Sequence, residues 1–315
     1  MQLFKKIKIY LIELRNKRKV LKILNDSKYK YNRMTAELIQ NTHSIEKGLS
    51  IEKPRLGFGH QKQENMLKLI NNLKNSKSEY HQEAIKMATD SLKEYVEFNN
   101  ENNYTDDIIE KIKEYLKEYK NDDNNKYGGT ITMERSKMKF NIEEIENFFE
   151  TRHSVRDFDT TEVEREKLEK ALELAQRAPS ACNRQGVRAY VLGKKHFDIM
   201  KDGLEGIGGF SEAVDKYILI TGKLTSYTPD ENYQYIVSAS IYAAYLSLTL
   251  HLYGLGACMI QRPVVFSKRM NLWREKLKIP GDEQIICLLG VGNLKEKYKV
   301  PVSHRLKNDE MIKFL

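Results

Sequence analysis

Side chains that bind anions are concentrated in one short segment of the chain, Arg152-His153-Ser154-Val155-Arg156. The planar guanidinium group of arginine donates two parallel, charge-assisted hydrogen bonds, a geometry that suits phosphate and carboxylate groups. The imidazole and hydroxyl groups between the two arginines add further donors. The segment therefore predicts an anion-binding site, although a solvated basic turn has the same composition.

Three further segments follow in the chain. Pro179-Ser180-Ala181-Cys182-Asn183 lies in a loop between a predicted helix and a predicted strand, and Gly254-Leu255-Gly256-Ala257-Cys258 ends a long apolar helix. Arg305 comes after the last apolar run. Each segment also has a purely structural interpretation, because serine caps turns and glycine ends helices.

The elements that must position these residues are predicted from the pattern of apolar residues. Apolar residues recur every three to four positions in helices, and they form short continuous runs in buried strands. Helices are expected over 141–150, 164–177, 195–203, 232–253 and 267–276, and strands over 187–193, 216–221, 256–261 and 283–291. The helix over 232–253 is nearly apolar along one side and rich in small residues, so we expect it to be buried on most faces. The pattern predicts an α+β domain with a mainly antiparallel sheet flanked by helices.

The order and spacing of the four segments resemble the nitroreductase family of FMN-dependent oxidoreductases, over about residues 141–315. In that family an arginine- and serine-containing segment opens the domain, a P-S-x-x-N-x-Q loop and a G-L-G-x-C turn follow, and a late arginine completes the phosphate site. The resemblance implies a nitroreductase-like fold and an FMN site. The implied cofactor-binding residues are Arg152, His153, Ser154, Arg156, Pro179, Ser180, Asn183, Met259, Ile260, Gln261 and Arg305.

The resemblance also implies roles. Arg152 and Arg305 would hold the phosphate, with His153 and Ser154 beside it or the ribityl chain. Arg156 is the expected catalytic residue, because a fixed cation beside the N1/O2 edge stabilises the anionic reduced flavin and raises its potential. The Pro179–Asn183 loop would come from the partner subunit of a homodimer, and the backbone of Met259, Ile260 and Gln261 would border the ring near N5.

The implied function is that of an FMN-dependent NAD(P)H oxidoreductase. Hydride would pass from NADH or NADPH to flavin N5 and then to a small acceptor. The identity of the acceptor stays open, because the fold does not fix the reaction. The alternative is a non-catalytic scaffold protein of a membrane-associated assembly with a vestigial flavin site.

Three departures from the family pattern affect the substrate pocket more than FMN binding. Gln185-Gly186-Val187 stands where Q-P-W is common, and Gln261-Arg262-Pro263 stands where an acidic residue is common. Ser303-His304 precedes the late arginine where a second lysine is common.

Residues 1–120 predict a helical N-terminal extension, and residues 121–140, rich in Asn, Asp and Gly, predict a linker. The extension resembles that of nitroreductase-like proteins encoded near surface-polysaccharide genes. Residues 1–30 form a basic amphipathic pattern, which fits either contact with an anionic membrane surface or packing on the protein. If residues 41–50 are helical, His43, Glu46 and Lys47 share one face, where they would orient the turn at Gly48 or contact a substrate.

The composition limits the other functions. The chain has 315 residues and a formal net charge of +9, yet its aromatic residues form no RNP-like stretch, so nucleic-acid binding is not predicted. Its three cysteines are widely spaced and its seven histidines lack metal-ligand spacing, so we expect neither a disulfide framework nor a metal. A cytoplasmic location is expected, with peripheral contact at the inner membrane face as the alternative.

Overall fold

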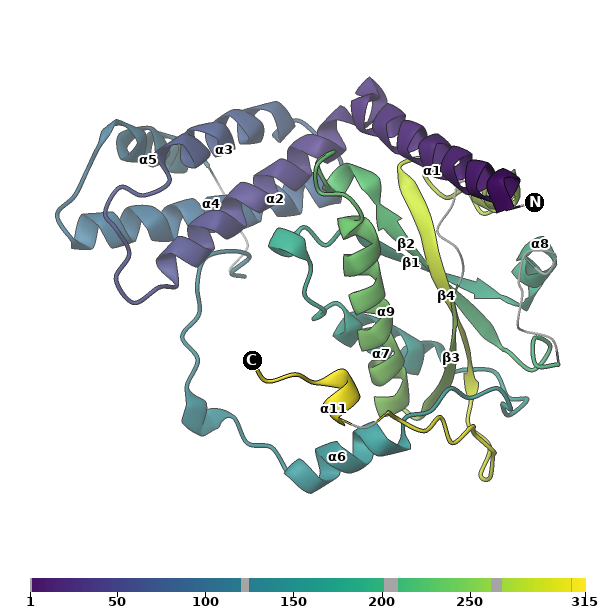
Figure 1. Ribbon diagram of the computed structural model, residues 1–315. Helices are drawn as coiled ribbons and strands as arrows, with labels where there is room; N and C mark the ends of the chain where they lie inside the picture. Colours follow the sequence, from purple (N-terminus) through teal and green to yellow (C-terminus); the bar gives the residue numbers. More distant parts are fainter. Residues whose placement is uncertain (1, 120–124, 201–208, 262–267, 307) are drawn as a thin grey trace.

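The computed structural model describes residues 2–119, 125–200, 209–261, 268–306 and 308–315 (Figure 1). Within these ranges the chain forms a helical N-terminal part followed by a mixed helix and sheet part. The α-helices are α1 Gln2–Asn25, α2 Lys30–Leu49, α3 His60–Leu73, α4 Glu79–Glu101, α5 Asp107–Glu118, α6 Ile142–Thr151, α7 Arg165–Ala175, α8 Phe197–Met200, α9 Gln234–Leu252, α10 Lys268–Lys276 and α11 Asn308–Met311. The strands are β1 Val187–Gly193, β2 Lys216–Lys223, β3 Leu255–Gln261 and β4 Glu283–Asn293, and the short 3-10 helices include η1 Ser27–Tyr29, η2 Arg135–Lys137, η3 Ala181–Asn183, η4 Lys194–His196 and η6 Leu224–Ser226.

The four strands form one sheet in the order β1-β2-β4-β3, and every neighbouring pair is antiparallel. Strand β4 is central and buried over almost its whole length, as its continuous apolar sequence predicts. The register of β2 against β4 shifts between Ile220 and Thr221, which lets β2 continue to Lys223, two residues beyond its predicted end. The predicted α+β class with a mainly antiparallel sheet is confirmed.

Helices cover both faces of this sheet. On one face α7 and α9 contribute Ala171, Ala239 and Leu246 to a core shared with Ile218 and Leu289. On the other face α10 contributes Met270 and Trp273, which pack with Leu219 and Leu288 of the sheet. The last three residues of the predicted helix over 195–203 and the first of that over 267–276 lie outside the described residues.

One face of α9 is left uncovered in the single chain. Ala239, Ala243 and Leu246 are fully buried, but Val237 and Leu252 are about half exposed, at 47% and 56%. The expected burial on most faces is therefore only partly achieved within one chain. α9 is also long and apolar enough to cross a bilayer by length and composition, with a mean hydropathy of 1.3, but its buried residues belong to the core of the sheet domain.

The N-terminal extension has its own apolar core, formed by α2, α3, α4 and α5 and including Leu38, Met66, Leu92 and Ile109. Figure 1 shows these four helices beside one end of the sheet domain, with α1 running across the top of the sheet. α2 contacts η3 and η6 of the sheet domain, so the extension lies directly beside the predicted Pro179–Asn183 loop.

A buried polar layer joins the extension to the sheet domain. Asn32 of α2 donates to Asp282 at 3.1 Å, and the ammonium group of Lys223 lies 4.4 Å from the centre of the Tyr80 ring of α4. Lys223 is 7% exposed, and burial lowers its pKa to about 8, with Arg188 adding to the effect. The layer fixes α2 and α4 against β2 and the start of β4.

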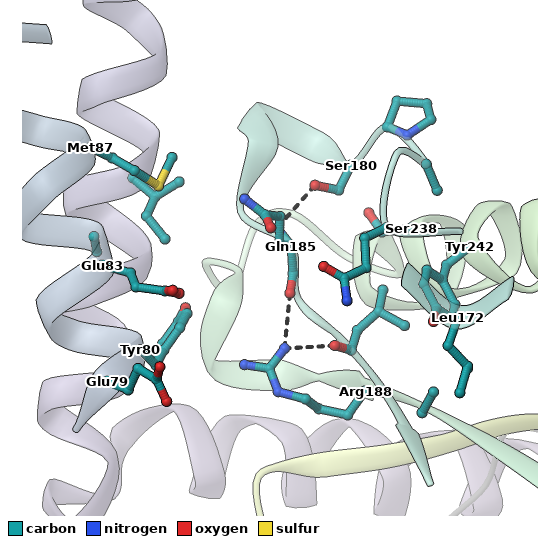
Figure 2. Close-up of a pocket in the computed structure, with 17 residues that line it drawn as sticks. Glu79, Tyr80, Glu83, Met87, Leu172, Ser180, Gln185, Arg188, Ser238 and Tyr242 are labelled. Carbon is teal, nitrogen blue, oxygen red and sulfur yellow. Dashed lines mark hydrogen bonds between the residues drawn. The ribbon is translucent and has the colours of Figure 1, made fainter. Parts of the chain in front are cut away.

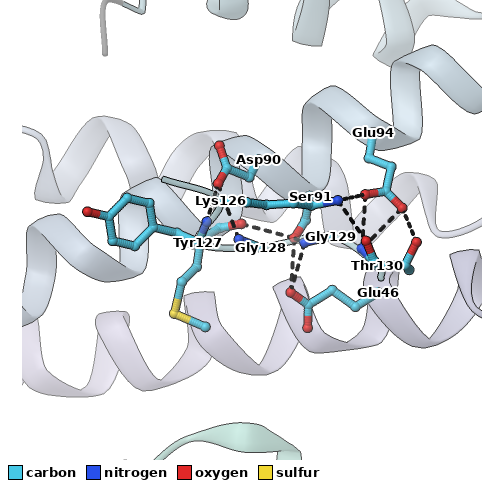
Figure 3. Close-up of polar contacts among 10 residues, drawn as sticks. Glu46, Asp90, Ser91, Glu94, Lys126, Tyr127, Gly128, Gly129 and Thr130 are labelled. Carbon is cyan, nitrogen blue, oxygen red and sulfur yellow. Dashed lines mark hydrogen bonds and ion pairs between the residues drawn. The ribbon is translucent and has the colours of Figure 1, made fainter. Parts of the chain in front are cut away.

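Part of the predicted linker is bound to α4 (Figure 3). The backbone N–H groups of Tyr127 and Gly128 donate to Asp90, and that of Thr130 donates to Glu94. Gly129 has φ 86 and donates to Glu46, which also accepts from Ser91. Of the predicted polar face on α2, Glu46 therefore orders the chain at Gly129, and His43 contacts Glu46 at 3.3 Å.

Candidate flavin site

The Arg152–Arg156 segment lies along the free edge of the sheet, beside β3. Ser154 forms a parallel bridge with Ala257, and the Val155 N–H donates to the Ala257 carbonyl at 3.0 Å. Val155 and Phe158 are buried beneath this segment. The segment is thus held by backbone pairing and by two apolar anchors, which leaves its polar side chains outside the core.

Two glycines allow this close approach. A Cβ at Gly256 would lie 2.8 Å from Leu294 and 3.2 Å from Val155, and one at Gly292 would lie 2.8 Å from the Phe158 ring. Such contacts are shorter than packed side chains tolerate. Gly256 is therefore needed to dock the arginine segment, whereas Gly254, with φ 71, follows the end of α9 as an ordinary helix terminus.

Three nitrogen-bearing side chains meet where this segment reaches the C-terminal end of α9. Arg152, His153 and His251 line a small cleft that also includes Ser247 and Tyr298. Burial lowers the pKa of His251, and the neighbouring Arg152 and His153 lower it further. Within the described chain the Arg152 guanidinium makes no hydrogen bond or ion pair, so its donors are available to an anion.

Arg156 lies on the same edge but points into a more open region. It is exposed, it lies 5.9 Å from the centre of the Phe210 ring, and its Nη1 donates weakly to the Ser154 carbonyl at 3.4 Å. Burial raises the pKa of Cys258 on β3, and the Arg156 cation partly offsets this. Arg156 therefore lies near β3, whose last residues are the predicted Met259, Ile260 and Gln261.

Arg305 is not joined to the Arg152 segment by any contact among the described residues. It is exposed in the C-terminal segment, where its guanidinium donates to the Ser303 carbonyl at 2.9 Å. Ser303 itself adopts a left-handed conformation with φ 47. The predicted pairing of Arg305 with Arg152 at one phosphate stays a prediction.

The loop after α7 is strained. Cys182, Asn183 and Gln185 all adopt left-handed conformations, with φ of 51, 51 and 49. Asparagine tolerates this region, but cysteine and glutamine seldom adopt it, and such strain concentrates at functional sites. The Ser180 hydroxyl accepts from the Gln185 N–H at 3.0 Å across the loop, but Ser180 makes no side-chain cap hydrogen bond to η3, so the N-capping interpretation of this residue is wrong for η3.

A buried ion pair holds this loop. Arg184 is 1% exposed, and its guanidinium binds both carboxylate oxygens of Glu231 while lying 4.8 Å from the centre of the Tyr227 ring. Hydrogen bonds from Arg184, despite opposing burial, lower the pKa of Glu231 to about 2, and Thr228 contributes. A Cβ at Gly186 would lie 2.8 Å from Ser226, so glycine suits the position where proline is common in the resembled family.

The predicted residues form two groups at opposite ends of α9. The Ala181 N–H lies 3.5 Å from the Ser238 hydroxyl near the start of this helix, whereas Arg152 and His153 lie beside His251 near its end. Thirteen residues of α-helix, from Ser238 to His251, span about 20 Å. In Figure 1 the loop after α7 and the segment after α6 accordingly lie at opposite ends of α9.

A cavity of about 500 Å³ lies beside the first group, between the sheet domain and the extension. Pro179, Ser180 and Gln185 line one side, and Tyr80, Glu83 and Met87 of α4 line the other (Figure 2). The predicted Pro179–Asn183 loop therefore opens on a pocket whose far wall belongs to residues 1–120.

Comparisons with known proteins bear on these two groups. Residues 149–204, which include the Arg152 segment and the loop after α7, match the family model described as Nitroreductase family. The resemblance to the nitroreductase family is confirmed. A search of curated proteins finds no match to the chain.

Solved structures of nitroreductases are also similar to this chain. An FMN-dependent nitroreductase from Clostridium difficile R20291 is 28% identical, with 53% of this chain and 96% of that one covered and a TM-score of 0.45. A nitroreductase family protein from Streptococcus pneumoniae TIGR4 is 21% identical, with 54% and 100% covered and a TM-score of 0.45. One from Clostridium difficile 630 is 23% identical, with 53% and 95% covered and a TM-score of 0.44.

Arg184, Glu231 and His251 lie at the two groups of candidate site residues, but the sequence interpretation did not select them. Arg184 lies inside the P-S-x-x-N-x-Q loop, but its partner is 47 residues away in the chain, and no local pattern links them. His251 ends an apolar helix, where a lone polar residue gives a weak signal. Its proximity to Arg152 depends on how α6 packs on α9, where the rings of Phe148 and His251 meet at a tilt of 40° with their centres 5.2 Å apart.

Proposed function

We propose that this protein is an FMN-dependent oxidoreductase that takes electrons from NADH or NADPH and passes them to a small organic acceptor. The observation that carries the proposal is the unpaired Arg152 guanidinium beside His153 and His251, in the segment that matches the nitroreductase model. Among the described residues the Arg152 guanidinium has no anionic partner, and its donors fit a phosphate monoester, which carries close to two negative charges at neutral pH.

The chain's own residues would bind and orient the cofactor. Arg152 and His153 would hold the phosphate, and Ser154 lies between them and Arg156 along the edge of β3. Arg156 would place a fixed positive charge beside the flavin ring, while β3 from Met259 to Gln261 would offer backbone groups at its edge. Bound FMN would supply the capacity to accept hydride and pass it on.

We further propose that each site is built from two subunits of a homodimer. The strained Pro179–Asn183 loop and the Arg152 segment lie at opposite ends of one α9, which disfavours a common cofactor within one chain. The uncovered apolar face of α9, with Val237, Tyr245 and Leu252 exposed, offers a surface that a second copy would bury.

Identification of the cofactor tests the proposal. The purified protein should be yellow, and the released cofactor should run as FMN in chromatography at about one per chain. NADH or NADPH should bleach the visible bands under anaerobic conditions. A colourless protein that does not bind added FMN would contradict the proposal, and a flavin that neither pyridine nucleotide reduces would favour the non-catalytic scaffold. Stoichiometric FAD would contradict the cofactor assignment.

We also propose that α1 contacts an anionic membrane surface. Its outward face carries Ile7, Leu11 and Leu21, all exposed, and Arg15, Arg18 and Lys22 border a shallow groove there with Leu11 and Leu14. Apolar side chains flanked by cations are the pattern of helices that lie in the headgroup region. Co-sedimentation with vesicles containing phosphatidylserine, compared with phosphatidylcholine alone, tests this. Replacement of Leu11 by glutamate should abolish any preference, and equal sedimentation with both vesicle types would refute it.

A further inference from the structure

The cavity between the two parts of the chain has walls of different character. On the sheet domain, Leu172 and Tyr242 supply apolar surface and Ser180 and Gln185 supply polar groups. On the extension, Met87 is apolar, whereas Glu79 and Glu83 place carboxylates at the rim. Pockets of this size with an apolar body and few polar groups bind small organic molecules. Because the pocket includes the Pro179–Ser180 segment, it adjoins the loop that the proposed function assigns to the flavin.

Glu79 and Glu83 have no cationic partner among the described residues. They are four residues apart on α4, where like charges destabilise a helix slightly. Glu79 lies in the first turn and gains from the helix dipole, but Glu83 lies beyond the first turn and has no such compensation. Figure 2 shows Glu83 pointing from α4 across the cavity toward the side that carries Gln185 and Arg188.

The opposite wall carries a cation, Arg188, whose donors bind backbone carbonyls rather than the two carboxylates. Nη1 of Arg188 donates to the carbonyl oxygens of Gln185 and Val187 at 3.1 and 2.6 Å, and its guanidinium lies 5.3 Å from the centre of the Tyr80 ring. It forms no ion pair with Glu79 or Glu83 among the described contacts. The cavity therefore presents two carboxylates against one guanidinium, a local excess of one negative charge among these three groups on a protein whose net charge is +9.

We propose that the N-terminal extension completes the acceptor pocket, and that Glu79 and Glu83 select aromatic acceptors that carry a positively charged group. This inference rests on the proposed function, because it takes the ligand of the cavity to be the electron acceptor. The apolar lining from Met87, Leu172 and Tyr242 would hold the aromatic body, and the two carboxylates would meet the cation at the rim.

Three nitroaromatic probes of similar size but different charge test the selection: 4-nitrobenzyltrimethylammonium, 4-nitrobenzyl alcohol and 4-nitrobenzoate. The comparison uses the full-length holoprotein and a variant with both Glu79→Gln and Glu83→Gln. In the variant, kcat/KM for the cation should fall about fivefold, the size expected for a charge pair in a solvent-open site, and less at high salt. The value for the neutral alcohol should stay within about twofold, because glutamine preserves the shape of the pocket.

Glu97→Gln is the matched control, because Glu97 is exposed on the same helix and does not line the cavity. Equal losses for the cation and the alcohol, or the same loss in Glu97→Gln, would overturn the proposal. The proposal would also be overturned if the ratio of kcat/KM for the cation to kcat/KM for the alcohol were the same in the wild-type protein and the double variant.

A second measurement needs no electron transfer. Benzyltrimethylammonium, which has no nitro group, should bind the wild-type protein in saturation-transfer NMR and isothermal titration, and the double variant should bind it about fivefold more weakly. If the protein reduces none of the nitro probes but binds this cation with the expected variant effect, the proposed function fails while the pocket assignment stands. Flavin turnover of all three probes without charge-dependent binding would overturn the inference alone.

Discussion

Arg184 and Glu231 form a bidentate ion pair in which the Arg184 side chain is buried. The pair joins the strained loop after α7 to the segment before α9. The pair spans 47 residues, and the Arg184 side chain is almost completely shielded from water. Cys182, Asn183 and Gln185 hold left-handed conformations on either side of Arg184. Strain of this kind persists only where neighbouring contacts determine the backbone, and here Arg184 binds both the Ala181 carbonyl within the loop and Glu231 outside it.

Glu231→Gln should therefore be strongly destabilising. It leaves a buried guanidinium without its counter-charge, a change that costs roughly 3 kcal/mol in comparable buried pairs. The folded-state pKa of Glu231 is lowered to about 2, so its contribution to stability is complete above its ordinary value of 4.5 and is lost as pH falls toward 2. Urea unfolding at several pH values should show a large loss at pH 7 and a much smaller difference between the variants near pH 2.

Glu212→Gln offers a control for that measurement, because this exposed carboxylate makes no hydrogen bond or ion pair among the described residues. A loss at pH 7 equal in Glu231→Gln and Glu212→Gln would contradict the assigned role of the buried pair.

Gly256→Ala should separate the arginine segment from the sheet. The added methyl group would meet Leu294 and Val155, and overpacking in a core costs roughly 1–3 kcal/mol. Because Val155 anchors the Arg152 segment to Ala257, we expect weaker FMN retention in addition to lower stability. Gly193→Ala is the matched control, since a Cβ there meets nothing within 4 Å. Equal FMN retention and stability in the two variants would refute the role of Gly256.

Local sequence patterns were sufficient to predict the main elements near the site. The expected helix over 141–150 appears as α6 Ile142–Thr151, because Asn141 caps it by accepting from the Glu144 N–H at 3.4 Å. The strand expected over 187–193 is β1 without change. Apolar spacing and capping residues act over a few positions, which is why they can be recognised along the chain.

The arrangement of the site could not be predicted in the same way. The separation of Asn183 from Arg152 depends on the length and packing of α9, and the contact of Arg184 with Glu231 depends on the loop before that helix. The placement of Glu83 opposite Gln185 depends on docking between residues far apart in the chain. Such contacts follow from tertiary packing and leave little periodic signal.

Arg156→Ala and Arg152→Ala should differ in their effects on a bound flavin. Arg152 lines the small cleft with His153, whereas Arg156 is exposed beside β3. We expect Arg152→Ala to weaken FMN binding more than Arg156→Ala does. Arg156→Ala should retain partial binding but lower the two-electron potential by a few tens of millivolts, since 30 mV corresponds to about 1.4 kcal/mol. Spectroelectrochemical titration measures this, and an unchanged potential together with an unchanged reduction rate would disprove the assignment of Arg156.

Lys223 should give the interface between the extension and the sheet domain a defined pH dependence. Its folded-state pKa is about 8 against an ordinary 10.5, so the buried charge opposes folding below pH 8 and this penalty fades as pH rises toward 10.5. Lys223→Met removes the titration, and its stability relative to wild type should be most favourable below pH 8 and decline toward pH 10.5. Thermal unfolding of both proteins across this pH range measures the difference in stability. Cysteines and tyrosines titrate in both proteins, so their contribution cancels in that difference. A difference that does not vary with pH would contradict the buried charge.

Composite sites can be tested by complementation between two inactive chains. Arg152→Ala removes the predicted phosphate donor, and Asn183→Ala alters the predicted partner loop at the other end of α9. The two variants would be co-expressed with different affinity tags, so that heterodimers can be purified. If each site uses Arg152 of one subunit and Asn183 of the other, a heterodimer contains one intact site and one doubly altered site, and it should bind about half the wild-type FMN. If each site is built within one chain, both sites of the heterodimer carry a substitution, and FMN content and activity should stay as low as in the parent variants.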